Sequence, residues 1–192
     1  MESVESEAQK FNAAAARLQQ SEFRTPQTPG EWQRAHKAPP KREYTKLFDA
    51  VLPLSEAFVS AGPAERRSIA ERLSPDALGI LRTFAHEAAV LAVRRESPRL
   101  IAQGLTVVAI LGEVDDARDL SFYLATLYHV ALKLGIDAPS LFAQAAALCS
   151  GFIRGVMESF PLLPPRSRSL AAFNLREVQT GDGYDITSAA TL

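Results

Sequence analysis

Hydrophobic residues recur at intervals of three and four positions along most of the chain, which is the spacing of one helix face. The pattern is densest over residues 74–160, where the facing sides of successive helices are nearly all apolar. Ser74-Pro75 and Ser97-Pro98 are helix start signals, since each places a capping residue before a proline in the first turn. Short connections between long helices favour antiparallel neighbours. The sequence therefore predicts an all-α fold, either an antiparallel helical bundle or a short stack of helix hairpins.

The order of apolar residues also predicts which helix is central. A helix over 115–134 is apolar nearly all round, so we expect it to be buried on every side. An earlier helix over 44–59 contains Pro53, and we expect this proline to kink it or split it in two.

The last helix of the core is expected to run unbroken over residues 140–160. Within it Ala147, Gly151 and Gly155 recur every four residues. A row of small residues lets a neighbouring helix approach closely. We therefore expect a tight helix contact along this row.

Four segments follow from these patterns. They are an N-terminal amphipathic helix, an extended proline-rich basic arm, a helical core and a C-terminal tail with a small hairpin or coil, over residues 1–20, 21–42, 43–160 and 161–192. The first helix is too short and too rich in alanine to be stable alone, so it must pack on its own core or on a partner.

The N-terminal segments carry the residues that we expect to bind a partner. The arm holds the only tryptophan of the chain, and tryptophan and arginine are favoured at interface hot spots. The alternative is that the same side chains pin the arm to its own domain. The candidate partner-binding residues are Phe11, Leu18, Phe23, Trp32, Arg34 and Lys37.

Composition narrows the classes of function. The formal net charge is −1, so no global field favours nucleic acid or an anionic membrane. Cys149 is the only cysteine, which excludes an intramolecular disulfide. The acidic N-terminus is unlike a signal peptide, and charged residues interrupt every apolar run, so no membrane span is expected. A cytoplasmic location is the natural expectation.

Few residues suggest catalytic chemistry, and we expect no cofactor and no metal. Asp116 and Asp119 share a helix start with Asp115, where carboxylates usually satisfy free backbone amides. The alternative is a small enzyme or ligand-binding protein, with a pocket around Tyr123, His129 and these two aspartates. No phosphate loop, zinc motif or nucleophile elbow accompanies them.

A second alternative is a DNA-binding regulator. Arginines lie on the two helices around Ser74, and a short helix, a turn and a longer helix are typical of a helix-turn-helix. The longer helix has an apolar middle and lacks Asn or Gln for base readout, so nucleic acid is not the expected partner.

Several short motifs lie between residues 80 and 185, among them Phe84-Ala85, Gly104-Leu105, the run from Leu127 to His129, Leu134-Gly-Ile-Asp137, Leu141-Phe142 and Gly183-Tyr184. These motifs resemble those of bacterial all-helical proteins of unknown function. The resemblance implies one helical unit with an ordered C-terminal segment, and it implies no activity. The sequence as a whole favours a non-catalytic helical module, of the adaptor or scaffold type, that binds a protein partner or a second copy of itself through its terminal arms.

Overall fold

The computed structural model describes residues 2–20, 41–114 and 120–162. These residues form eight α-helices and one short 3-10 helix, with no strand among them, which confirms the all-α prediction. The elements are α1 (Glu2–Gln20), α3 (Lys41–Ser60), α4 (Pro63–Glu71), α5 (Pro75–Arg95), α6 (Pro98–Glu113), α7 (Leu120–Lys133), α8 (Ala138–Ala146), α9 (Gly151–Ser159) and η2 (Phe160–Leu162). Among the described helices, none is long and apolar enough to cross a membrane.

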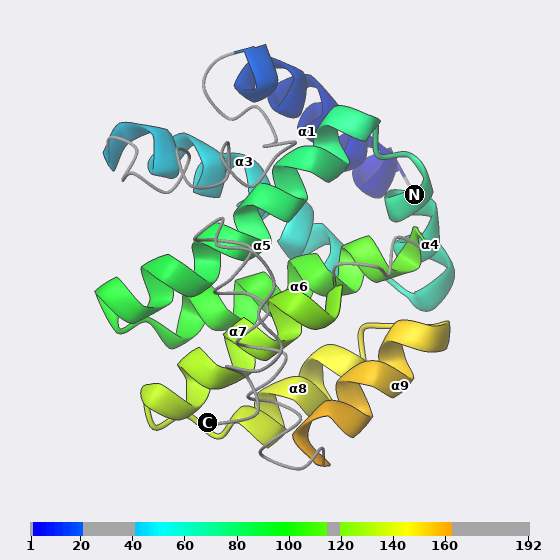
Figure 1. Ribbon diagram of the computed structural model, residues 1–192. Helices are drawn as coiled ribbons and strands as arrows, with labels where there is room; N and C mark the ends of the chain where they lie inside the picture. Colours follow the sequence, from blue (N-terminus) through cyan, green and yellow to red (C-terminus); the bar gives the residue numbers. More distant parts are fainter. Residues whose placement is uncertain (1, 21–40, 115–119, 163–192) are drawn as a thin grey trace, which may run out of the picture.

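The helices pack in an order that largely follows the sequence. Helices α1 and α3 lie at one end of the molecule, α8 and α9 lie at the other, and α5, α6 and α7 lie between them (Figure 1). The short helix α4 packs against α1, α3 and α6. The buried hydrophobic residues form one cluster that runs through all of these elements.

The α5–α6 hairpin follows from the two predicted start signals. The Ser74 hydroxyl accepts a hydrogen bond from the Ala77 amide at 3.2 Å, which caps the start of α5. Helix α5 ends at Arg95 and is followed by its cap residue Glu96, whose φ of 48° lies in the left-handed region and whose amide donates to the Ala92 carbonyl. Ser97 and Pro98 then begin α6, so only two residues separate the two helices.

The central helix is α6, which corrects the prediction for residues 115–134. Helix α6 packs against α3, α4, α5, α7, α8 and α9, and each residue from Gly104 to Leu111 is buried. Helix α7 instead exposes His129, Leu132 and Lys133. Helix α7 covers the core from one side although its sequence is apolar nearly all round. An apolar sequence therefore does not by itself place a helix at the centre.

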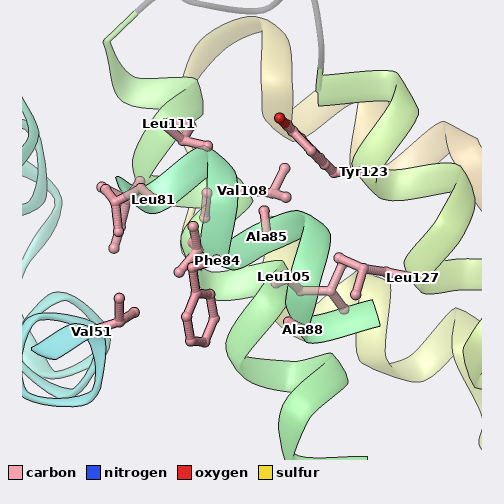
Figure 2. Packing of buried hydrophobic residues seen from close by; sticks show 14 of the residues in the cluster. Val51, Leu81, Phe84, Ala85, Ala88, Leu105, Val108, Leu111, Tyr123 and Leu127 are labelled. Carbon is pink, nitrogen blue, oxygen red and sulfur yellow. The ribbon is translucent and has the colours of Figure 1, made fainter. Parts of the chain in front are cut away.

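Two glycines of α6 allow its neighbours to come close. A Cβ atom at Gly104 would lie 2.9 Å from the Leu127 side chain of α7. At Gly112 it would lie 2.5 Å from Cγ2 and 2.7 Å from Cβ of Ile153 in α9. Figure 2 shows Leu105 and Leu127 meeting beside Ala88, where α5, α6 and α7 converge.

The predicted helix over residues 140–160 is two helices. Helix α8 ends at Ala146 and α9 begins at Gly151, whose φ of 57° is the left-handed conformation that favours glycine. Ala147 and Gly155 are exposed, and a Cβ atom at Gly155 would meet nothing within 4 Å. The expected row of small residues therefore makes no helix contact, and the close approach occurs at Gly112 instead.

Helix α3 continues through Pro53 from Lys41 to Ser60, so the proline does not split it. The proline is exposed, while Leu47, Val51, Leu54 and Phe58 form an uninterrupted buried face. Burial of that face offsets the loss of one backbone hydrogen bond at the proline.

Helix α1 packs on its own chain, against α3, α4 and α5. Phe11 is 2% exposed and Leu18 is 7% exposed, so both belong to the core. The Asn12 side chain donates to the Arg72 carbonyl at 2.8 Å and accepts from the Ser74 amide at 2.9 Å, which ties α1 to the α4–α5 turn. Helix α1 is thus part of one packed unit with the core.

Candidate binding groove

The residues predicted to bind a partner fall into two groups. Phe11 and Leu18 face the core of their own chain and are buried there, so in this structure they offer little surface to a partner. The other four, Phe23, Trp32, Arg34 and Lys37, lie outside the described residues. So does the expected C-terminal hairpin.

The alternative pocket near His129 involves four residues, of which the structure describes Tyr123 and His129. Tyr123 is buried, whereas His129 is exposed on α7. Asp116 and Asp119 lie outside the described residues. Within the described ranges, no group of three or more His, Cys, Asp or Glu side chains has the arrangement of a metal site.

Helix α5, the candidate recognition helix of the DNA-binding alternative, has a buried middle. Helix α5, which would be the recognition helix, packs against α1, α3, α6 and α7. A recognition helix must present a face to the major groove of DNA. Ile80, Leu81 and Phe84 in the middle of α5 are instead buried, so its middle part is a core element.

A groove lies between α3 and α6. Its volume is about 290 Å³. It is lined by Leu52, Ser55, Glu56, Val59 and Ser60 of α3 and by Arg99, Ala102, Gln103 and Thr106 of α6. The positions recur every three or four residues on each helix, so the groove is formed where one side face of α3 meets one side face of α6.

The groove combines apolar and charged side chains. Val59 is 47% exposed, which is uncommon for a large aliphatic residue, and Leu52 is half-buried beside it. Glu56 on the α3 wall and Arg99 on the α6 wall are both exposed. Neither charged side chain forms a hydrogen bond or ion pair within the described part of the chain. The two walls therefore offer opposite charges that are available to a ligand.

Ser55 adds an unsatisfied polar group to the groove wall. The residue is 4% exposed, and its hydroxyl oxygen has no hydrogen-bond partner among the described residues. A buried hydroxyl without a partner costs about 1–3 kcal/mol. The nearby Thr106 hydroxyl already donates to the Ala102 carbonyl at 3.0 Å. The Ser55 hydroxyl oxygen is thus enclosed within the protein and has no partner among the described residues.

A second cluster of polar groups, which we call the polar junction, comprises Arg66, Arg67, Glu113 and Ser150. The Glu113 side chain is only 3% exposed. Its carboxylate accepts from the Ser150 amide at 2.7 Å and from the Ser150 hydroxyl at 2.8 Å. Arg67 donates to the same hydroxyl at 3.3 Å. Glu113 thereby supplies the cap for the start of α9.

Arg66 completes the polar junction at the ends of two other helices. It donates to the Phe58 and Val59 carbonyls at the end of α3 and to the Ala147 carbonyl at the end of α8. A cation at a helix C-terminus is favourable. Arg66 thereby holds the ends of α3 and α8 together, while the exposed Arg67 contacts the cap residue of α9.

The polar junction is structural because its groups satisfy one another. The Ser150 hydroxyl donates to the Glu113 carboxylate and accepts from Arg67, so its hydrogen bonds are used within the cluster. Cys149 beside it is buried, and desolvation raises the pKa of its thiol to about 12, with the nearby Glu113 charge as a smaller cause. That thiol is inert rather than nucleophilic.

Extra apolar residues in α3 are the sequence feature that corresponds to the groove, although their spacing alone does not predict a groove. Helix α3 has more apolar positions than one buried face requires, and Leu52 and Val59 lie off the face formed by Val51, Leu54 and Phe58.

Comparison with protein-family models, with curated proteins and with solved structures finds no match to this chain.

Proposed function

We propose that this chain is a non-catalytic protein-binding module that receives a short segment of a partner protein in the groove between α3 and α6. The observation that carries the proposal is the pairing of exposed apolar surface at Val59 with opposite charges at Glu56 and Arg99, which have no ion-pair partner among the described residues. A solvated groove of this kind has the composition of a small protein interface, with an apolar centre and a polar rim.

The volume of the groove favours a side chain over a metabolite. Sites for small ligands usually measure about 300–1,000 Å³ and bury most of the ligand. A volume of about 290 Å³ lies just below that range and is bounded by only two helices. It suits one large side chain of a docked peptide better than a whole cofactor or substrate.

The proposal moves the binding surface from the N-terminal helix to the body of the protein. Helix α1 uses Phe11 and Leu18 in its own core, so its apolar face is already covered. Participation of Trp32, Arg34 and Lys37 stays a prediction from the sequence. A cytoplasmic location and binding to a second copy of the chain belong to the same proposal.

Peptide selection tests this function even though the partner is unidentified. A random peptide library is selected on the full-length protein, and enriched peptides are then measured on two variants. Val59→Lys places a charge in the groove, whereas Leu132→Lys changes an equally exposed leucine on α7, at 51% exposure. Both sites are exposed, so neither substitution should disturb the core.

We expect the enriched peptides to lose binding to Val59→Lys and to keep it with Leu132→Lys. A selection that enriches no peptide would contradict the proposal. Peptides that bind Val59→Lys as tightly as the original protein would contradict it equally, because they would use another surface.

A further inference from the structure

The polarity of the groove specifies its occupant more closely. Glu56 lies in the last turns of α3, which ends at Ser60. Arg66 of α4 already donates to the Phe58 and Val59 carbonyls at that helix end, so the negative charge of this wall is that of Glu56 itself. Arg99 lies in the first turn of α6, which has no acidic residue there and no side-chain hydrogen bond from its cap, Ser97. A helix end is negative at its C-terminus and positive at its N-terminus. On the α6 wall the positive charge of Arg99 and the positive helix end therefore act together.

The two walls thus attract opposite charges. The α3 wall favours a cation near Glu56, and the α6 wall favours an anion near Arg99. Apolar groups of Leu52, Val59 and Ala102 lie in the same groove. Exposed ion pairs add little affinity, but they set orientation and reject partners with the wrong charge order.

We infer that the groove binds a segment of another protein chain in which one large apolar side chain is flanked by an acidic and a basic residue. The apolar side chain occupies the space between Leu52, Val59 and Ala102. The basic residue pairs with Glu56 and the acidic residue pairs with Arg99. This inference rests on the proposed function and adds the chemistry of the partner.

The chain itself supplies a suitable probe, because Glu31-Trp32-Gln33-Arg34 has this charge order around an aromatic residue. The probe is a synthetic, dye-labelled peptide of residues 28–37. Its binding is measured by fluorescence anisotropy on the full-length protein and on full-length Trp32→Ala. A second measurement mixes the unlabelled probe with Trp32→Ala. Trp32 is the only tryptophan of the chain, so the probe then carries the only indole in the mixture. A blue shift of the tryptophan emission reports its entry into an apolar site.

Charge reversal supplies the decisive comparison. Arg99→Glu should weaken binding of the probe by about three- to tenfold. A probe in which Glu31 is replaced by arginine should bind the unmodified groove poorly and should recover binding to Arg99→Glu. Lys133→Glu, an exposed charge reversal on α7, is the matched control and should leave binding unchanged.

Three results together support the inference. The probe binds the unmodified protein and Trp32→Ala with similar affinity, its tryptophan emission shifts to the blue on binding, and the probe with arginine in place of Glu31 recovers binding to Arg99→Glu. Binding to Trp32→Ala alone would overturn it, since the chain's own segment would then be the occupant. Saturable binding without charge dependence, or no binding of the probe, would also overturn it. The proposed function is judged separately, by whether the peptide library yields binders that Val59→Lys abolishes.

Discussion

At the scale of single residues, glycine positions decide how closely the helices of this fold can pack. Gly112 lies under Ile153, and a Cβ atom added at Gly112 would meet the Cβ atom of Ile153, which cannot move without its backbone. Gly104 faces chiefly the flexible end of Leu127. The two sites therefore differ in how easily they can accept a methyl group.

Gly112→Ala should destabilise the protein by about 1–3 kcal/mol, because α9 must move away from α6. Gly155→Ala is the matched control, since Gly155 is also in a helix but has open space around it. That substitution should leave stability unchanged or raise it by about 0.5–1 kcal/mol. Urea unfolding of the two variants measures both effects, and equal stability of the two would show that α6 and α9 are not in close contact.

Cys149 provides a chemical test of burial at one residue. Desolvation raises its pKa from 9.0 to about 12, so the folded protein holds a neutral thiol under mildly alkaline conditions. Iodoacetamide should therefore modify the folded protein far more slowly than the protein in urea. Mass spectrometry over time measures this, and equal rates in the two conditions would contradict the burial of the thiol.

The same pKa gives the sign of a pH effect. The folded-state value lies above the ordinary value of 9.0, so the folded state keeps its proton where the unfolded state loses it. The contribution of Cys149 to stability is complete below pH 9.0 and is lost as the pH rises towards about 12.

At the scale of elements, the connection between α8 and α9 depends on a carboxylate from α6. Glu113 accepts two hydrogen bonds from Ser150, which lies 37 residues further along the chain. Local sequence cannot reveal such a cap. The positive φ at Gly151 also separates α8 from α9. Neither the Glu113 cap nor the glycine conformation alters the spacing of hydrophobic residues, so the sequence pattern over residues 140–160 predicts a single helix.

Glu113→Gln should destabilise the protein by about 1–3 kcal/mol, because a buried amide cannot accept both hydrogen bonds from Ser150. Glu158→Gln, at an exposed ion pair with Arg154, should change stability little. Thermal unfolding compares the two variants. If Glu113→Gln melted at the temperature of the unmodified protein, the polar junction would not stabilise the α8–α9 connection.

Start signals, by contrast, are readable from sequence. Ser74-Pro75 and Ser97-Pro98 place the beginnings of α5 and α6 correctly, since capping and the fixed φ of proline act within one turn. The groove is not readable in this way. It exists only where side faces of α3 and α6 meet, and their relative position depends on packing among α1, α5 and α6.

At the scale of the whole molecule, α1 joins the core although residues 21–40 separate it from α3 in the sequence. The helix packs against α3, α4 and α5, and Asn12 bonds to both sides of the α4–α5 turn. Burial of Phe11 and Leu18 in this way leaves the groove between α3 and α6 as the candidate binding surface of the described chain.

Deletion of residues 1–20 tests this account most directly, with urea unfolding and light scattering performed on the same samples. The account predicts a large loss of stability, because Phe11 alone should contribute about 3–5 kcal/mol, and a mass per particle that falls only by the deleted residues. A truncated protein that unfolds at the same urea concentration as the full chain but dissociates from a larger assembly would contradict it, since α1 would then act between chains.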